Sequence, residues 1–339
     1  MIRTRDLLPA SLPVRLRAAR RGLQLLRRLA SRRSTFAKYS GHLLLALYFI
    51  ATTSRNGGLR RTALSAGRER ARYWKQQWYR KRRRLEAAAV VDDICASYAA
   101  EQLGIAHREI RNDLEAAVSR YSPHDLLGFD PRSGRIPRDV PEDCACGVPT
   151  ERGRRRCRKC RRPLALRGRY EVWYSALIKT YFCERWGHRL PAGYSDVMSL
   201  LPKLRPYPRP RSRHYRDAIY AVTHIVYTLN DYNRSRLPAR LVRRECAFLK
   251  GSMAWAISRG EADTVGEIVD SLGGCGVADT DPLMMQGRAF ILEQQRADGG
   301  WGDADDEYGR FHSVWTCIDG LRDYSWPANR RRQTGPTSI

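Results

Sequence analysis

The 339-residue sequence has no hydrophobic run long enough to cross a membrane. The longest apolar stretch, Leu43–Ala51, holds nine residues, whereas a transmembrane helix needs about 20. The stretch also begins too far from Met1 to be an ordinary secretion signal. It can therefore be either a short amphipathic element at a membrane interface or a buried helix, and we favour the buried helix.

Acidic residues are scarce in the first quarter of the chain. Residues 1–84 contain 23 lysines and arginines but only two acidic residues, Asp6 and Glu69, and they carry most of the net charge of +27. A basic, acid-poor segment binds polyanions such as nucleic acid or anionic lipid without sequence specificity. We therefore predict a basic, helical N-terminal arm over residues 1–85. The excess of arginine over lysine, 55 to 7, is also typical of codon bias.

The nine cysteines do not show the even spacing of a disulfide framework. The sequence therefore predicts a reducing, cytoplasmic location, with peripheral attachment to a membrane as the alternative. Four cysteines form two close pairs separated by ten residues: Cys144, Cys146, Cys157 and Cys160. Two such pairs are typical of a zinc ion held tetrahedrally by four thiolates. We predict a structural zinc in a ribbon-like loop over residues 144–162, which would stabilise the loop and do no chemistry.

One eight-residue pattern occurs twice in the C-terminal half. Residues 224–231 read HIVYTLND and residues 312–319 read HSVWTCID. At about 3.6 residues per turn, the first, fifth and eighth positions share one face of a helix. The residues that would share a face are His224, Thr228 and Asp231 in the first copy, and His312, Thr316 and Asp319 in the second.

Paired histidines and aspartates on equivalent helix faces can line an active site, or they can be hydrogen-bonded groups of a buried core. Both interpretations stay open. A histidine titrates near pH 6.5, so His224 and His312 could act as acid–base groups or bind a second metal ion. Asp231 and Asp319 would lie about 10 Å further along their helices, which predicts two polar tiers. Tyr227 and Trp315 would line the pocket and could stabilise a cation through their rings.

The remaining pattern is helical. Residues 86–120 predict two amphipathic helices around Gly104, and the stretch from Ser122 to Asp143 predicts a linker or lid. Further helices are predicted over residues 170–187, 214–232, 239–259, 261–273, 280–296 and 312–324. Degraded copies of the pattern, DTVGEIVD at 263–270 and YEVW at 170–173, indicate a repeat of about 47 residues, typical of stacked helical hairpins. The predicted domains are thus 1–85, 86–143, 144–162 and 163–326, followed by a basic disordered tail at 327–339.

Residues 294–302 read QQRADGGWG. This segment resembles the QW motif of terpene cyclases and protein prenyltransferases, in which a glutamine caps helix backbone groups and a tryptophan packs over it. The resemblance covers roughly residues 214–325 and is clearest at 280–302. It implies an α/α toroid, with parallel inner helices around a cavity and outer helices running back. The helices at 217–232, 261–273 and 312–324 would then be inner ones, and both repeated faces would point into the cavity.

The same resemblance implies two kinds of site. Asp303-Ala304-Asp305-Asp306 matches the letters of the proton-donating D-x-D-D motif of class II terpene cyclases, which would make Asp305 and Asp306 catalytic. Phe311-His312 and Cys317 resemble the zinc-binding segment of protein prenyltransferases, although the spacing differs. The fold class that we predict is all-α: a partial α/α toroid with a four-cysteine zinc loop and a basic N-terminal arm.

Two functions follow from these patterns. The first is an enzyme that acts on a hydrophobic substrate, isoprenoids included, in a central helical cavity. The second is a non-catalytic, zinc-stapled scaffold that binds nucleic acid or an anionic membrane through residues 1–84. A scaffold would fill the centre of the repeat with apolar side chains, whereas an enzyme keeps a pocket with a few convergent polar groups.

Overall fold

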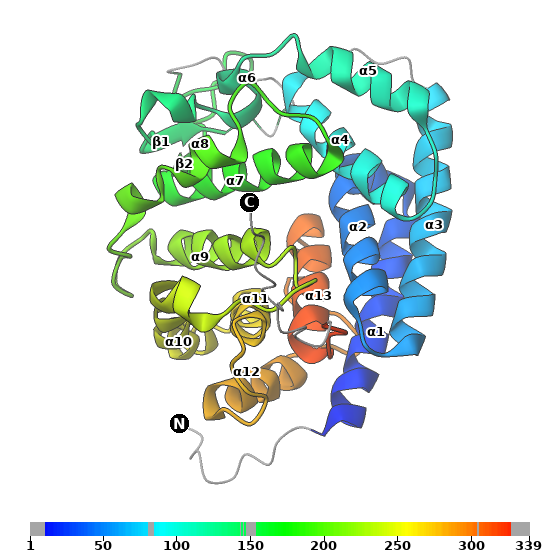
Figure 1. The fold of residues 1–339 in the computed structure, drawn as a ribbon, viewed down its shortest axis with the longest axis vertical. Coiled ribbons are helices and arrows are strands. Elements are labelled where there is room, and N and C mark those ends of the chain that lie inside the picture. The colour runs from blue at the N-terminus through cyan, green and yellow to red at the C-terminus, as the bar shows by residue number, and fades with distance from the viewer. Residues whose placement is uncertain are drawn as a thin grey trace, which may run out of the picture.

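The computed structural model describes residues 11–80, 85–142, 144, 146, 154–303 and 305–326. These residues are mostly helical (Figure 1), which confirms the all-α prediction. The longer helices are α1 (Leu12–Ser31), α2 (Arg33–Thr53), α3 (Gly57–Arg80), α4 (Ala87–Gln102), α5 (Arg108–Val118), α7 (Arg169–Trp186), α9 (Tyr215–Leu229), α10 (Arg243–Ser258), α11 (Ala262–Gly274), α12 (Pro282–Glu293) and α13 (Glu307–Leu321). Shorter elements are α6 (Pro123–Leu127), α8 (Tyr194–Met198), β1 (Asp139–Pro141) and β2 (Leu166–Gly168).

Helix ends follow the sequence signals closely. Gly104 follows α4 and Gly187 caps α7, both with positive φ, a conformation that glycine adopts without strain. Asp281 caps α12 by accepting a hydrogen bond from the Leu283 backbone N–H, with Pro282 in the first turn. The predicted helices are therefore present, but α13 begins at Glu307, five residues before the predicted start.

Six helices form a closed circuit of contacts. Going round it, α2 contacts α4, α4 contacts α7, α7 contacts α9, α9 contacts α11, α11 contacts α13, and α13 returns to α2. We call these six the lining helices. They alternate along the chain with helices that pack outside them: α1, α3, α5, α10 and α12 each contact one or two lining helices.

Neighbouring lining helices run in the same direction around most of the circuit. Early residues of one helix contact early residues of the next, and late residues contact late ones. Between α2 and α13, Thr35 lies by Glu307 and Phe49 by Trp315. Between α7 and α9, Tyr174 lies by His224, and Tyr181 by Asp231 just after α9. The same order holds between α9 and α11 (Tyr220 by Asp263, Thr223 by Glu267) and between α11 and α13 (Asp263 by His312, Asp270 by Asp319). The corresponding ends of these helices therefore meet at the same side of the molecule.

Residues 12–80 of the predicted N-terminal arm form three helices that pack on one another, on α4 and on α13. In Figure 1, α1, α2 and α3 lie side by side along one edge of the molecule, and α1 packs on α13. The apolar stretch Leu43–Ala51 is buried in α2, as expected for a buried helix. The physical reason is that the arginines of α1 alternate with an apolar face that must be covered. Residues 1–10 and 81–84 lie outside the described residues.

The QW-like segment joins the last hairpin to the first. Gln295 Nε2 donates to the backbone oxygens of Ala18, in α1, and Gly299, each at 2.9 Å. Trp301 is fully buried, and its Nε1 donates to the Ile291 oxygen in α12 at 2.6 Å. A Cβ at position 22 of α1 would lie 2.7 Å from the Trp301 ring, so glycine is needed there for the close approach. The motif thus closes the circuit of helices.

For the segment from Ser122 to Asp143 the sequence predicts a linker or lid, and its described residues, 122–142, pack against the helices. Its helix α6 contacts α4 and α7, and Leu126, Leu127 and Phe129 are buried. Strand β1 pairs antiparallel with β2, with Asp139 opposite Gly168, and this two-stranded base carries the cysteine loop. The predicted tail at 327–339 lies outside the described residues.

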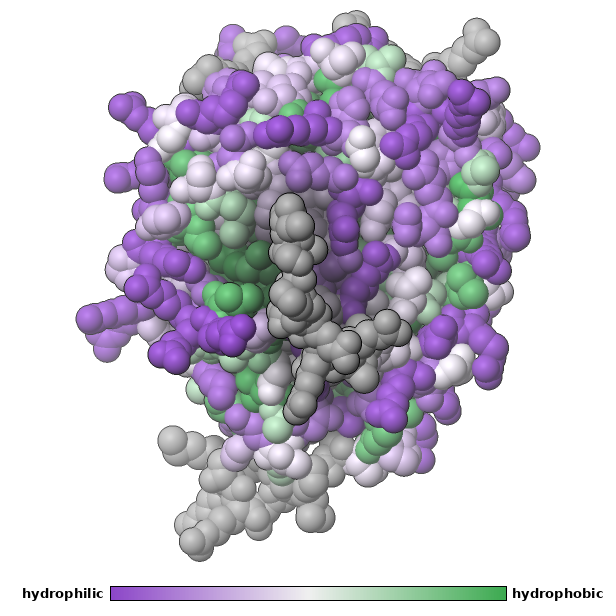
Figure 2. Space-filling model, viewed as in Figure 1, coloured by the Kyte–Doolittle hydropathy of each residue, from purple (hydrophilic) through white to green (hydrophobic). Residues whose placement is uncertain are grey.

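None of the described helices combines the length and the apolar character that crossing a bilayer requires. On the face drawn in Figure 2, hydrophilic residues predominate and apolar residues form separate patches. Over the described part of that face, no continuous apolar area suggests a docking surface.

Candidate functional site: a titratable cavity between six helices

The lining helices enclose one cavity of about 290 Å³, at the lower end of the range for small-molecule sites. Each of the six contributes side chains to it. Aromatic and aliphatic residues form much of the wall: Leu45, Phe49, Tyr174, Ile178, Phe182, Tyr220, Tyr227, Tyr232, Tyr308 and Trp315. Most of the other lining residues are titratable: His42, Cys95, Arg216, His224, Asp263, Glu267, Asp270, Asp306, His312 and Asp319.

The cavity has an exposed rim and a buried floor. At the rim, Asp306 is exposed and Tyr308 is 38% exposed, both near the start of α13. At the floor, Asp270 is 4% exposed, and Phe49 and Phe182 are buried. Because the lining helices share a direction, the floor lies at their C-terminal ends. Tyr227 and Trp315 both line the cavity, as the sequence predicted.

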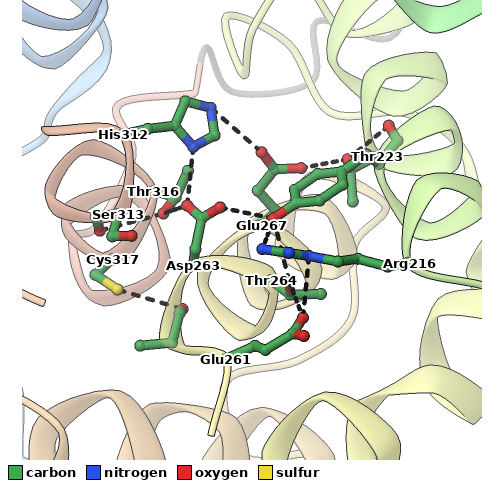
Figure 3. A network of polar contacts seen from close by, with 12 residues as sticks. Arg216, Thr223, Glu261, Asp263, Thr264, Glu267, His312, Ser313, Thr316 and Cys317 are labelled. Carbon is green, nitrogen blue, oxygen red and sulfur yellow. Dashed lines mark hydrogen bonds and ion pairs between the residues drawn. The ribbon is translucent and has the colours of Figure 1, made fainter. Parts of the chain in front are cut away.

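Asp263 of α11 and His312 of α13 form a partly buried ion pair near the rim, with side chains 16% and 15% exposed. Figure 3 shows the two side chains pointing toward one another, with Nδ1 of His312 2.9 Å from Oδ1 of Asp263. Asp263 also accepts hydrogen bonds from Thr316 Oγ1 at 2.8 Å and from the Tyr220 hydroxyl at 2.7 Å. Burial alone would lower the pKa of His312, but Asp263 raises it to about 9. Burial alone would raise the pKa of Asp263, but His312 and the hydrogen bonds hold it at about 2.

Glu267 lies one turn further along α11 and faces the same imidazole. Its Oε1 is 3.8 Å from His312 Nε2, and its other oxygen accepts a hydrogen bond from Thr223 of α9. The side chain is 1% exposed, and burial raises the pKa of Glu267 to about 8 despite the nearby His312. Glu267 is therefore a neutral carboxylic acid at pH 7, next to an imidazolium.

His224 of α9 has the opposite electrostatic character. Its Nδ1 lies 2.7 Å from the Tyr220 backbone oxygen. Because that oxygen can only accept, Nδ1 carries the hydrogen and Nε2 keeps a lone pair. The ring stacks on Tyr174 at 5.3 Å between centroids, with 14° between planes. Burial lowers the pKa of His224 to about 4, so it is a neutral base at pH 7.

A second tier of carboxylates lies at the floor, as predicted for Asp319. Asp270 accepts hydrogen bonds from Asn233 Nδ2 at 2.8 Å and from the Tyr324 hydroxyl. Burial, together with the facing Asp319, raises the pKa of Asp270 to about 7. Asp319 is held by Arg322, whose Nε lies 2.6 Å from Oδ1, and burial raises the pKa of Asp319.

Asp231, predicted as the partner of Asp319, lies outside the cavity. Helix α9 ends at Leu229, and residues 231–233 have φ between 50 and 62°. The chain therefore turns away before the eighth position of the pattern can share the face of His224. Asp231 instead pairs with Arg185 and Arg234 and accepts the Tyr181 hydroxyl. The expectation of two equivalent aspartates in the cavity is wrong.

The acidic run behind the QW-like segment contributes little to the cavity. Asp305 is exposed and does not line it, and its backbone N–H binds the Asp303 carboxylate at 3.0 Å. Asp306 lies at the exposed rim, at the N-cap of α13. Asp305 lies away from the cavity and Asp306 reaches only its exposed rim, so nothing in the structure supports the interpretation of Asp305 and Asp306 as proton donors.

Sequence reasoning missed Asp263 and Glu267, the two acids closest to His312. The signal was present in the degraded copy DTVGEIVD at 263–270. Its first, fifth and eighth positions are Asp263, Glu267 and Asp270, which occupy the same helix face as the named residues of the two clear copies. His42 of α2 was missed as well, and no copy of the pattern marks it.

The four predicted cysteines converge. Sγ of Cys144 lies 3.4 Å from that of Cys160, Sγ of Cys146 lies 3.5 Å from that of Cys157, and all four sulfurs lie within 4.8 Å of one another. Tetrahedral zinc with Zn–S bonds near 2.3 Å needs sulfurs about 3.8 Å apart. The cluster could therefore hold a metal ion.

A second metal at His224 and His312 is not supported. Within the described ranges, the cysteine cluster is the one group of three or more histidine, cysteine, aspartate or glutamate ligands close enough to bind a metal. His312 is instead engaged through Nδ1 by Asp263. Cys317, which resembled a prenyltransferase zinc ligand, is buried and its thiol donates to the Ala262 backbone oxygen at 3.3 Å.

The geometry of the cavity thus brings an imidazolium, a neutral carboxylic acid and a neutral imidazole to one small space.

Comparisons with protein-family models, curated proteins and solved structures give no match for this chain.

Proposed function

We propose that the chain is an enzyme with an α/α-toroid fold, of the kind found in terpene cyclases and protein prenyltransferases, and that it transfers protons to and from a small hydrophobic substrate in the central cavity. The closed circuit of lining helices and their shared direction support the toroid. The cavity, with a few convergent polar groups in an aromatic wall, favours an enzyme over the scaffold alternative.

The observation that carries the proposal is the separation of pKa values within one cavity. Glu267 keeps its proton at pH 7, His224 lacks one, and His312 is charged. Titratable groups whose surroundings push their pKa values apart are the arrangement that acid–base catalysis requires. A purely structural hydrogen-bond network has no need of an unprotonated nitrogen facing a cavity.

The roles follow from the contacts. Glu267 is the general acid, which gives its proton to a carbon–carbon double bond of the substrate. The carboxylate left on Glu267 is then stabilised by the His312 imidazolium, 3.8 Å away, and by the Thr223 hydroxyl. Asp263 is a positioning residue that keeps His312 charged. His224 is the general base, since Nε2 is free to take a proton at the end of the reaction.

Aromatic side chains would stabilise positive charge that develops on the substrate. Tyr227 and Trp315 line the cavity at the two copies of the pattern, where their rings can face a cation. The small volume favours a compact substrate, such as a short isoprenoid, over a long polyprene.

Deuterium incorporation tests this proposal whatever the product is. The protein is incubated in D₂O buffer with a series of linear isoprenoid alkenes and alcohols of increasing length. The deuterium content of the recovered substrate and product is then measured by mass spectrometry. Proton transfer from Glu267 leaves one deuterium at carbon. We expect incorporation by wild type, and loss of at least a hundredfold in Glu267→Gln, as is usual for removing a general acid.

Asp305→Asn is the matched control, because it removes an exposed acid that does not line the cavity. It should keep the wild-type rate. Absence of incorporation with every substrate, or full incorporation by Glu267→Gln, would contradict the assignment of Glu267.

For the cysteine cluster we propose a structural zinc. Four thiolates leave no open coordination position, so the ion would stabilise the loop between β1 and β2. The backbone N–H of Lys159 lies 3.4 Å from the Cys157 sulfur and would help to fix that thiolate.

A further inference from the structure

The floor of the cavity lies where several helices end. Tyr227, Asp270 and Asp319 each fall within the last five residues of their helices, as do Phe49 and Phe182. The C-terminal end of a helix carries a partial negative charge, from carbonyl groups that have no partner within the helix. Parallel helices that end together therefore make the floor favourable for a cation.

The side-chain charges at the floor also favour a cation. Asp270 and Asp319 face each other, and one cation, Arg322, lies close to both. Arg322 is already bound to Asp319, and its remaining donors bind the hydroxyls of Thr53 and Ser54. The hydrogen-bond donors to Asp270 are neutral side chains, those of Asn233, Tyr324 and Tyr227. Above pH 7, where Asp270 is ionised, the floor therefore holds two carboxylates and one cation.

Aromatic rings surround these carboxylates. Tyr232 stacks on Phe49 at 4.6 Å between centroids and on Tyr227 at 5.5 Å, and Phe49 stacks on Trp315 at 6.4 Å. Trp315 is buried, and its Nε1–H is directed to the Asp319 carboxylate, so its indole forms part of the wall beside that carboxylate. Ring faces beside carboxylates are the surroundings in which proteins bind organic ammonium groups.

Other charged ligands fit this floor less well. A metal ion needs at least three ligand atoms within reach of one another, and among the described residues the four cysteines alone meet that condition. An anion would meet two carboxylates and the negative ends of the helices. An organic cation avoids both conflicts.

We propose that the cavity binds a protonated primary amine on a small apolar body, with the ammonium group at the floor between Asp270 and Asp319. This inference rests on the proposed function and names the substrate class for the same cavity. The ammonium donates to the two carboxylates, the apolar body lies along Phe49, Phe182 and Ile178, and the far end of the molecule reaches Glu267 and His312 nearer the rim.

Calorimetric titration with three probes of one length tests the proposal: hexylammonium, hexan-1-ol and hexanoate, at pH 8. We expect hexylammonium to bind at least about tenfold more tightly than hexan-1-ol, as for hydrogen bonds to charged groups, and hexanoate not to bind. Asp270→Asn should weaken hexylammonium binding by about tenfold and leave hexan-1-ol binding unchanged. Asp305→Asn, the exposed control, should change neither.

The affinity for hexylammonium should also rise from pH 6 to pH 8, because a cation binds the ionised form of Asp270. The groups that face Asp270 are Tyr227 from α9, Glu267 from α11, Asp319 from α13, and Arg322 and Tyr324 from the segment after α13. Of these, Glu267 has a raised pKa near the same range, so the rise should persist in Glu267→Gln but disappear in Asp270→Asn.

The outcomes separate the two proposals. Binding of hexan-1-ol without a preference for hexylammonium would overturn the amine assignment and leave the acid–base cavity standing. Failure of all three probes to bind would count against both. Should Asp270→Asn not fold, the probe series and its pH dependence in wild type still decide.

Discussion

His224 and His312 occupy the first position of the same eight-residue pattern, yet their electrostatic surroundings are opposite. His224 bonds to a backbone oxygen and stacks on Tyr174, and burial lowers its pKa to about 4. His312 bonds to the Asp263 carboxylate and stacks on Tyr308, and its pKa rises to about 9. The pattern fixes where each imidazole lies, and the neighbouring helix fixes its charge.

The two aspartates that close the pattern differ even more. Asp319 is at the floor of the cavity, held by the fully buried Arg322, whereas Asp231 is in a turn outside it, paired with the half-exposed Arg185. A repeated sequence therefore makes repeated structure only as far as the helix continues. Two experiments compare the two copies, and a third concerns the cysteine loop.

The largest loss of stability is expected from removing the carboxylate of Asp319 at the floor of the cavity. Asp319→Asn leaves Arg322 buried without its partner, which should lower the free energy of unfolding by about 4 kcal/mol. Asp231→Asn removes a pair that water screens, so the loss should be about 0.5 kcal/mol. Urea unfolding followed by circular dichroism measures both. Equal losses in the two variants would show that the two aspartates are equivalent after all.

The two histidines are expected to change the free energy of unfolding in opposite directions as pH rises, by less than the Asp319→Asn variant does. His312 has a folded-state pKa of about 9, above its unfolded value near 6.5, so its contribution is complete below pH 6.5 and is lost as pH rises through 9. His224 has a folded-state pKa of about 4, so its contribution is complete above pH 6.5 and is lost as pH falls toward 4. Each amounts to roughly 3 kcal/mol.

Unfolding free energies measured from pH 4 to pH 10 separate these contributions. Relative to wild type, His312→Gln should flatten the alkaline side of the stability profile, and His224→Gln should flatten the acid side. Glu267 and Asp270 also have raised pKa values and make wild type less stable as pH rises, so the comparison is between variants. Two variants with the same profile would refute the difference in charge state.

The smallest effect on the helical body is expected at the cysteine loop. Cys157→Ser should reduce zinc from one equivalent per chain to none, because three sulfurs no longer close the shell. Cys157 lies between β1 and β2 and outside the lining helices, so the free energy of unfolding of the helices should change by less than about 0.5 kcal/mol. Metal analysis beside urea unfolding measures both. A second equivalent of zinc that disappears in His312→Gln would restore the metal hypothesis for the histidine pair.

Local rules determined much of this protein from its sequence. The spacing of cysteines placed four sulfurs in one cluster, because short spacers bring their side chains together whatever surrounds them. Apolar periodicity, with Gly104 as a break, predicted the helices. The repeated pattern placed His224, His312, Tyr227 and Trp315 at one cavity, since equivalent positions on equivalent helices share a face.

The tertiary structure decided the rest, because these properties depend on residues distant in sequence. The basic composition of residues 12–80 concealed the apolar faces of α1, α2 and α3, which are covered by contacts with one another, with α4 and with α13. The turn after Leu229 removed Asp231 from the cavity. Above all, the charges of His312, Glu267 and Asp270 arise from burial and from partners on other helices. Electrostatic energy depends on distance and on the exclusion of water, and neither is written in the local sequence.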